Sequence, residues 1–292
     1  MLNPLKSVIS MNKLSVYGAS GFIGGTFCDL YPDDVIKIPR EQREPESKDI
    51  IYFISTTTNH HVFKDLHKDV DTNLTVLMDV LDYCRDNDLT FENNNFQGVT
   101  FNFVSSAFVY GTDVIDAKEG DPCDPGGFYS ITKRCAEQLL ISFCKTFDIK
   151  YRIMRIANVY GEDKTISSQK NVLKFLIGLL KEDKPITLYD DGMQLRDYMH
   201  VKDICRAMKI VIDEGEVNSI YNIAAGNPLP FKSIIERAKE LIGSKSEIGF
   251  APTPHFNKIA QANNYSVNVD KLRGLGFEPE ISFDEGLKNL CV

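Results

Sequence analysis

The sequence predicts an α/β protein with a doubly wound parallel sheet and a smaller mixed α/β domain at its C-terminal end. A short apolar strand runs directly into a glycine-rich turn at residues 13–24. Further apolar strand-like runs alternate with amphipathic helical runs, which is the order of a parallel sheet with helical crossovers. Hydrophobic residues make up 43% of the 292 residues, enough for a sizeable core.

Charge and composition exclude several classes of partner. The net charge is -8, which argues against a nucleic acid or an anionic membrane. No apolar run is long enough to span a bilayer, and residues 1–13 lack an apolar signal region. The seven cysteines include no Cys-x-x-Cys pair, and the five histidines show no metal spacing. We therefore expect a cytoplasmic protein with reduced cysteines and no metal site.

The first element is a strand at residues 13–17, followed at once by the run GASGFIG at residues 18–24. In a dinucleotide-binding turn the first glycine permits the tight turn, the second lets the backbone approach the pyrophosphate, and the third lets the helix pack on the strand. The phosphates then rest on the helix N-terminus. The run therefore predicts a Rossmann turn that binds NAD or NADP through Gly18, Ser20, Gly21, Phe22, Ile23 and Gly24.

The second strand is expected at residues 35–38. An NAD-preferring site would carry an acidic residue near its end, for the ribose 2′-hydroxyl. This chain has Pro39-Arg40-Glu41 instead. Arg40 either meets a 2′-phosphate, which favours NADP, or is a surface arginine on a charged loop. Only residues 39–49 precede the third strand, near the lower limit for a crossover, so the usual second helix should be vestigial.

The third strand, residues 50–54, is continuously apolar, as a buried parallel strand should be. It ends in small hydroxyl residues, where ligands sit in such sheets, and Ser55 is a candidate cofactor contact. A helix follows at residues 73–85. It carries two apolar stripes, one of Leu74, Leu77, Met78 and Leu81 and one of Val76, Val80 and Tyr83. A helix apolar on two sides is covered on two sides, either by a homodimer interface or by burial in the monomer.

The fourth strand, residues 101–104, ends in Ser105 and Ser106, which places Ser106 to hydrogen-bond a substrate oxygen beside the cofactor cleft. A turn at residues 122–127 opens a helix over residues 128–140. In this helix Tyr129 and Lys133 are four residues apart and share one face. An offset stripe could bury against the sheet; it consists of Ile131, Cys135, Leu139 and Phe143.

The Tyr129–Lys133 pair could carry proton transfer. A free tyrosine has a pKa near ~10 and is a poor base at neutral pH. A nearby ammonium favours the phenolate and lowers that pKa, so the pair could move a proton to or from a sugar or alcohol hydroxyl. By itself the spacing also fits a solvated tyrosine and a surface lysine.

The remaining elements alternate in the same way. They are a strand at 151–156, a helix at 172–180, a charged loop at 190–203 opening a helix through 211, a strand at 221–224, and helices at 234–242 and 285–290. We expect residues 11–161 and about 200–225 to form the cofactor-binding domain. Residues from about 162 to 199 and from 226 to 292 should form the substrate-binding domain.

Six motifs follow one another over nearly the whole chain. They are GASGFIG at Gly18, Asn73-Leu-Thr, SSAFVYG at Ser105, YSITK at Tyr129, RIANVYG at Arg155 and DGMQLRDYMHVKD at Asp191. In this order they resemble the extended short-chain dehydrogenases/reductases of the nucleotide-sugar epimerase/dehydratase family. The resemblance implies a catalytic set of Ser106, Tyr129 and Lys133, with Lys133 also holding the nicotinamide ribose.

The same resemblance implies that Asn158 and Arg196 hold the nucleotide-diphosphate sugar, with Arg196 facing the diphosphate. A guanidinium fork suits phosphate oxygens. The alternative for Arg196 is a surface salt bridge with Asp197.

The reaction implied by the resemblance is hydride exchange with a sugar carbon, often C4. An epimerase returns the hydride to the other face of the keto sugar, whereas a 4-ketoreductase runs in one direction. In the 4,6-dehydratase branch an Asp-Glu pair follows the catalytic threonine. Here those positions are Ala107 and Phe108, which cannot titrate, and this argues against a dehydratase.

Three departures from the family pattern bear on the choice. The strand-two acid is missing, the usual His-Leu-Ala-Ala is replaced at residues 53–56, and the chain is short. The missing acid and the short chain favour an NADPH-linked reductase of deoxysugars. The run Ser-Ala-x-Val-Tyr-Gly favours a 4-epimerase, which we place first.

A non-catalytic relative would not need Ser106, Tyr129 and Lys133 together. A ketoreductase of small molecules would not need Asn158 and the Arg196 loop.

Overall fold

The computed structural model describes residues 10–57, 59–86, 99–162, 172–260 and 263–292. Its centre is a six-stranded parallel sheet with the strand order β11-β6-β4-β3-β1-β2. The strands are β1 (Ser10–Tyr17), β2 (Val35–Lys37), β3 (Ser47–Tyr52), β4 (Thr100–Ser106), β6 (Lys150–Ile156) and β11 (Ser219–Ile223). The order reverses between β1 and β3, and ligands bind at the carboxyl ends of strands at such a switch point.

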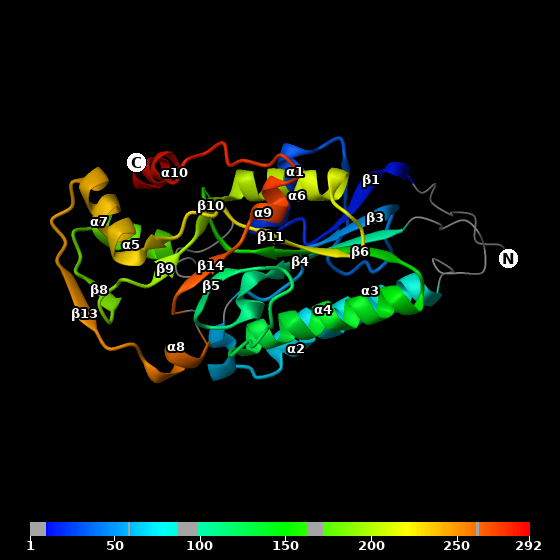
Figure 1. Cartoon of the computed structure of the whole chain (residues 1–292), viewed down its shortest axis with the longest axis horizontal. Coiled ribbons are helices and arrows are strands. Elements are labelled where there is room, and N and C mark those ends of the chain that lie inside the picture. Colours follow the sequence, from blue (N-terminus) through cyan, green and yellow to red (C-terminus); the bar gives the residue numbers. More distant parts are fainter. Residues whose placement is uncertain (1–9, 58, 87–98, 163–171, 261–262) are drawn as a thin grey trace.

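Helices cover both faces of this sheet (Figure 1). On one face α1 (Phe22–Leu30) packs beside α6 (Val201–Glu214), and on the other lie α3 (Val76–Asp86) and α4 (Phe128–Thr146). Alternate strand residues supply the two apolar layers: Ile51 enters the α1–α6 layer, whereas Ile50 enters the α3–α4 layer. The predicted doubly wound α/β fold is confirmed.

The connection from β2 to β3 is short. Residues 38–46 contain a turn and no helix. The expectation of a vestigial second helix is confirmed, because so few residues can reach the neighbouring strand only as an extended loop.

The helix expected at residues 73–85 begins earlier than its apolar stripes suggest. A 3₁₀ turn, η1 (Asn59–Phe63), precedes a short α2 (Lys68–Val70), and a π-helical turn, η2 (Asp71–Thr75), then leads into α3. Such π turns occur often at functional sites. Asn73 lies in this one and is buried.

The face that α4 buries differs from the expected one. Its buried side chains are Ser130, Thr132, Lys133, Ala136, Glu137, Leu140 and Cys144. Ile131 and Leu139, from the stripe expected to face the sheet, are 47% and 37% exposed, and that expectation was wrong. Lys133 is buried in place of an apolar residue because its ammonium has partners inside the protein.

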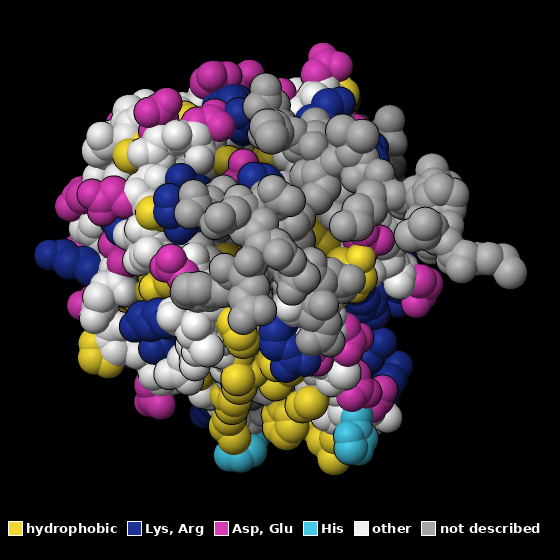
Figure 2. All heavy atoms as spheres, turned by 90° about the vertical axis from the view of Figure 1, so that its right-hand side faces the viewer, with side chains coloured by type: hydrophobic (Ala, Val, Ile, Leu, Met, Phe, Trp, Pro, Cys, Tyr) yellow, Lys and Arg dark blue, Asp and Glu magenta, His cyan; other side chains and the backbone are white. Residues whose placement is uncertain are grey.

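Figure 2 shows hydrophobic side chains gathered near the lower edge of the molecule, the side on which the α2–α4 region lies in Figure 1.

A second lobe lies beyond the carboxyl ends of the strands (Figure 1). Its core joins α5 (Val172–Lys181), α7 (Phe231–Ile242), α10 (Phe283–Cys291) and β8 (Ile186–Tyr189), and β8 pairs with β13 (Ile248–Ala251). We call this the C-terminal lobe and the sheet with its helices the sheet lobe.

Short strand pairs connect the two lobes. They are β7 (Asn158–Tyr160) with β10 (Tyr198–His200), β9 (Leu195–Arg196) with β12 (Leu229–Pro230), and β5 (Val114–Ala117) with β14 (Tyr265–Val267). The short helices η3 (Ala107–Tyr110), α8 (His255–Ala260) and α9 (Asp270–Arg273) complete the described elements. Sequence analysis missed these pairs, because strands of two to four residues carry no readable periodicity.

All seven cysteines are free, and five of them are buried, as expected of reduced core residues. None of the helices in the described part of the chain is long and apolar enough to cross a membrane.

Candidate active site

The glycine-rich turn has the geometry that dinucleotide binding requires. Gly18 has a φ of +82°, and a Cβ there would lie 3.1 Å from the backbone nitrogen of Ile54. The backbone N–H of Gly21 donates to the carbonyl oxygen of Gly18 at 3.0 Å, and a Cβ at Gly24 would overlap that same oxygen. Gly18 and Gly24 are therefore required by a close approach of the backbone, whereas a Cβ at Gly21 would make only ordinary contact, 3.4 Å from the carbonyl oxygen of Gly18.

The N-terminus of α1 can accept an anion. Its N-cap is Gly21, which offers no side-chain acceptor to the first N–H groups of the helix. These N–H groups and the positive end of the helix dipole suit a pyrophosphate. The turn thus fits the cofactor predicted from its sequence, with Ser20, Phe22 and Ile23 beside the glycines.

Three predicted side chains converge at the carboxyl edge of the sheet. Ser106 is the last residue of β4, and Ser55 follows β3, the strand beside it. The hydroxyl groups of both serines hydrogen-bond the phenol of Tyr129, which is half-buried at the start of α4. Gly18 lies against Phe53 and Ile54, just before Ser55, so the glycine-rich turn and the phenol share the carboxyl edge of the sheet.

Lys133 lies one helical turn after Tyr129 and is 2% exposed. Its ammonium donates to the carbonyl oxygen of Val104 at 2.6 Å and lies 4.2 Å from the centroid of the Phe103 ring. Burial lowers the pKa of Lys133 to about 7, and the nearby carboxylate of Glu137 offsets part of that shift. The lysine can therefore gain or lose a proton near neutral pH.

The pKa of the Tyr129 phenol moves in the opposite direction to the expected one. Burial raises it, while its hydrogen bonds with Ser106 and Ser55 lower it in part. The prediction of a phenol made acidic by the ammonium is therefore wrong for the protein without ligands. The physical reason is desolvation, which disfavours the phenolate.

Asn73 holds Ser55 in place. Its side-chain oxygen accepts from the Ser55 hydroxyl at 3.0 Å and from the backbone N–H of Thr56 at 2.8 Å. Its nitrogen donates to the hydroxyls of Thr56 at 3.0 Å and Thr132 at 2.9 Å. Sequence reasoning gave this residue no role. A signal was present, because an asparagine that opens an apolar helix commonly hydrogen-bonds outside it.

Asn158 and Arg196 are brought close by the pairing of β7 with β10. The backbone N–H and the side-chain amide of Asn158 donate to the carbonyl oxygen of Asp197 at 3.2 and 3.3 Å. The half-buried guanidinium of Arg196 donates to the carbonyl oxygen of Asn263 at 2.6 Å, and burial lowers its pKa. The Asp197 carboxylate accepts from the backbone N–H of Gly226 at 2.9 Å.

Arg40 is exposed just beyond β2, which is the edge strand next to β1. Its carbonyl oxygen accepts from the guanidinium of Arg43 at 2.9 Å, which fixes the backbone of this loop. The placement at the carboxyl end of β2 is compatible with a ribose contact.

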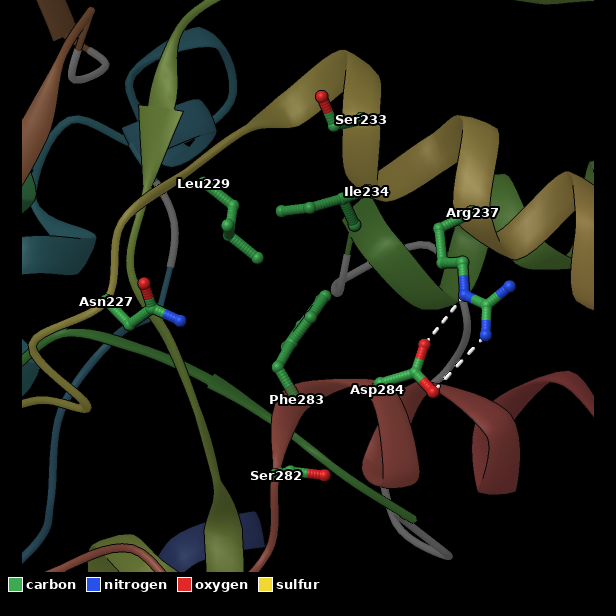
Figure 3. A pocket seen from close by; sticks show the side chains of 8 residues that line it. All are labelled: Asn227, Leu229, Ser233, Ile234, Arg237, Ser282, Phe283 and Asp284. Carbon is green, nitrogen blue, oxygen red and sulfur yellow. Dashed lines mark hydrogen bonds and ion pairs between the residues drawn. The ribbon is translucent and has the colours of Figure 1, made fainter.

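A pocket of about 330 Å³ lies elsewhere, in the C-terminal lobe (Figure 3). Its lining is Asn227, Leu229, Ser233, Ile234, Arg237, Ser282, Phe283 and Asp284, and Arg237 pairs with Asp284 at 2.7 Å. None of the candidate site residues lines it. Within the described ranges, no three histidine, cysteine or carboxylate side chains are grouped as metal ligands.

Comparison with known proteins gives a family match. The model of the NAD dependent epimerase/dehydratase family matches residues 32–224, more than half of the chain. The low-salt glycan biosynthesis protein Agl12 of Haloferax volcanii is 31% identical over 226 residues, which cover 76% of this chain and 67% of that protein. The dTDP-4-dehydro-6-deoxyglucose reductase of Escherichia coli is 26% identical over 247 residues, covering 83% of this chain and 73% of the reductase.

Solved structures show the same fold. The UDP-glucose 4-epimerase of Thermotoga maritima with UDP-glucose has a TM-score of 0.80 at 21% identity, covering 96% of this chain and 97% of its own. RMD from Pseudomonas aeruginosa complexed with NADPH has a TM-score of 0.79 at 21% identity, covering 96% and 98%. At these identities the likeness concerns the fold alone.

Proposed function

Because the chain belongs to the NAD-dependent epimerase/dehydratase family, we propose that it epimerises a nucleotide-diphosphate sugar at a hexose carbon, with C4 as the first candidate. The observation that carries this proposal is the convergence of Tyr129, Ser106 and Ser55 on one point beside the glycine-rich turn. A phenol with two hydroxyl partners can move a proton to or from a sugar hydroxyl held there.

The cofactor would be held by residues that already fit it. The turn at residues 18–24 would take the pyrophosphate, and Ser55, Tyr129 and Lys133 would surround the nicotinamide ribose. When bound, NAD or NADP supplies the acceptor and donor of hydride and, in its oxidised form, a positive charge. A positive charge near the Tyr129 phenol lowers its pKa and so offsets the effect of burial.

The protein's own contribution is proton transfer and placement. The Tyr129 oxygen takes the proton of the sugar hydroxyl as the carbon is oxidised, and it returns the proton on reduction. The Ser106 hydroxyl shares a hydrogen bond with that phenol and would hold the sugar oxygen within hydrogen-bond distance of it. Asn158 at the start of β7 and Arg196 in β9, two residues before the Tyr198 that pairs with Asn158, would hold the nucleotide diphosphate, with the guanidinium on the phosphates.

Elimination of water has no support in this site. Ala107 is fully buried, and the ring of Phe108 packs edge-on against Tyr265, with centroids 5.1 Å apart. Neither side chain can donate or accept a proton in a dehydration. We therefore do not propose a dehydratase.

A second candidate is an NADPH-dependent reductase of a nucleotide-linked 4-keto-6-deoxysugar. A neutral Tyr129 phenol can protonate the alkoxide that forms on reduction, a step that this candidate shares with the epimerase. The likeness to the Escherichia coli reductase and the exposed Arg40 agree with this candidate. A non-catalytic role would leave the convergence of Ser106, Tyr129 and Lys133 unexplained.

The experiment follows the sugar without added cofactor. Purified protein is incubated with UDP-glucose and with dTDP-glucose, and the C4 epimer is sought by NMR. Conversion with tightly bound NAD supports the epimerase, because that enzyme recycles its cofactor. Stoichiometric NADPH oxidation with a dTDP-4-keto-6-deoxyhexose supports the reductase, and failure of both reactions contradicts the assignment.

We also propose how the chain is divided and assembled. Residues 11–161 and about 200–225 would bind the cofactor, and residues from about 162 to 199 and from 226 to 292 would bind the sugar nucleotide.

The exposed Met78, Ile131 and Leu139 of α3 and α4 favour a homodimer through these helices. Sedimentation at two concentrations tests the dimer. The free buried cysteines suit a cytoplasmic location, which cell fractionation tests.

A further inference from the structure

The side chain of Asn59 joins η1 to the start of α4 and to the end of α8, beside the candidate active site. Asn59 is the first residue of η1, directly after the β3 loop that carries Ser55, and it is 8% exposed. Its side-chain oxygen accepts from the backbone N–H of Tyr129 at 3.1 Å. Its side-chain nitrogen donates to the carbonyl oxygen of Ala260, the last residue of α8, at 2.6 Å. One amide therefore bonds α4, which carries Tyr129, and α8, which lies in the part of the chain proposed to bind the sugar nucleotide.

The bond to Tyr129 replaces a missing N-cap. The N-cap residue of α4 is Gly127, which has no side chain to accept from the free N–H groups of the first turn. Asn59 supplies that acceptor from another element, at the N–H of the residue that bears the catalytic phenol. Asparagine is among the best residues for this bond in ordinary N-caps.

Two glycines make room for the arrangement. A Cβ at Gly127 would overlap the side-chain oxygen of Asn59, and a Cβ at Gly126 would overlap the carbonyl oxygen of Ile259. The backbone before α4 is thus packed directly against the Asn59 amide and against the last turn of α8. These close backbone contacts do not depend on the two hydrogen bonds of Asn59. They require the same close approach of η1, the start of α4 and α8.

An aromatic cluster covers the junction. The rings of Phe63 in η1 and Phe256 in α8 meet edge-on with centroids 4.6 Å apart, and His60 lies 5.2 Å from Phe256. These contacts join the same two elements as the amide of Asn59. An edge-on aromatic pair stabilises such a contact beyond the effect of its buried area.

We propose that Asn59 is a positioning residue with two separable tasks. Through its oxygen it fixes the first turn of α4, and with it the Tyr129 phenol; through its nitrogen it fastens α8 over that turn. The catalytic meaning of this role rests on the proposed function, whereas the two bonds do not. Because α8 belongs to the lobe assigned to the sugar nucleotide, the first task should affect turnover and the second should affect substrate affinity.

Three variants separate the two tasks. Asn59→Ala removes both bonds. Asn59→Asp keeps an oxygen for the Tyr129 N–H, at a helix N-terminus that favours negative charge, but cannot donate to Ala260. Phe256→Ala loosens α8 and leaves Asn59 intact, so it serves as the matched control for the second task.

The test measures amide hydrogen exchange by mass spectrometry and then steady-state kinetics on the full chain. In Asn59→Ala the Tyr129 amide should exchange about tenfold faster, the order expected for a lost N-cap bond, and kcat should fall. In Asn59→Asp and Phe256→Ala the Tyr129 amide should exchange as in the wild type. In these two variants residues 255–260 should exchange faster, and KM should rise with little change in kcat.

Two results would overturn the proposal. One is unchanged exchange at Tyr129 in Asn59→Ala, and the other is equal acceleration at Tyr129 in Asn59→Asp and Asn59→Ala. If Asn59→Ala does not fold, the Asn59→Asp and Phe256→Ala variants decide the question. The proposal holds if amide exchange in both becomes faster at residues 255–260 while the Tyr129 amide stays protected, and it fails otherwise. Exchange needs no substrate, so a failure of the proposed reaction is recognised separately, as absent turnover with the expected exchange pattern.

Discussion

The ammonium of Lys133 donates to the carbonyl oxygen of Val104 at 2.6 Å, between α4 and β4. The lysine is 2% exposed, and the bond aims its charge at the end of the strand that carries Ser106. Burial lowers its pKa to about 7 from the ordinary value of 10.5. A buried lysine of this kind links the protonation state of the site to the stability of the fold.

Stability should therefore depend on pH through Lys133. Its folded pKa is depressed, so between pH 7 and 10.5 the unfolded chain holds a proton that the folded chain lacks. The contribution of Lys133 to the free energy of unfolding then rises with pH in this window, by up to about 1.4 kcal/mol per pH unit. Lys133→Met removes the dependence. We would measure the free energy of unfolding of both proteins in urea at pH 7, 8 and 9. The value for the wild type should rise relative to that of the variant as the pH rises, and a constant difference would contradict the assignment.

The motifs were readable from the sequence because each depends on local chemistry. Gly24 is needed by a contact within its own turn, and Gly18 by its positive φ, while Tyr129 and Lys133 lie one helical turn apart by spacing alone. The direction in which α4 faces was not readable. The stripe through Ile131 and Leu139 is as apolar as a core face, and only the partners of Lys133 show that the other face is buried.

Long-range partners were also beyond the sequence. Asn59 and Ala260 are 201 positions apart, and Asn73 and Thr132 are 59 apart. Nothing near either asparagine in the chain predicts which atoms it meets. The direction of the Tyr129 pKa shift was missed for a related reason, because desolvation depends on packing from distant segments.

Tyr129→Phe removes only the phenol oxygen and should abolish most of the turnover. General acid–base catalysis contributes about 10²–10⁴ in rate, so we expect a loss of that order. Cofactor affinity should be retained, because the glycine-rich turn and Lys133 are unchanged. The control is Tyr31→Phe, at the far end of α1. Turnover by Tyr129→Phe equal to that of the control would exclude the phenol as the proton carrier.

A buried ion pair behind the site should be essential to the fold. Arg155 and Glu137 are 1% and 0% exposed, and the guanidinium meets the carboxylate at 3.0 and 2.8 Å. Arg155→Met leaves the buried carboxylate with Arg134, at 2.8 Å, as its remaining ion-pair partner, and should lower the free energy of unfolding toward the lower end of about 3–5 kcal/mol. Adding Glu137→Leu removes the carboxylate that has lost its buried partner and should recover part of the loss. Urea unfolding measures both, and a loss below 1 kcal/mol for the single variant would contradict the prediction.

Arg40 should decide between the two cofactors. Its side chain is exposed at the carboxyl end of β2, where a 2′-phosphate would lie, and no acidic residue takes the ribose hydroxyl at this position. If it binds that phosphate, Arg40→Ala should weaken NADPH binding about tenfold or more, the order of a charge-assisted hydrogen bond, and leave NADH binding unchanged. Fluorescence titration of both cofactors measures this, with the exposed Lys37→Ala as control. A clear preference of the wild type for NADH would assign Arg40 to the surface and favour the epimerase, since an enzyme that recycles bound NAD has no use for a 2′-phosphate contact.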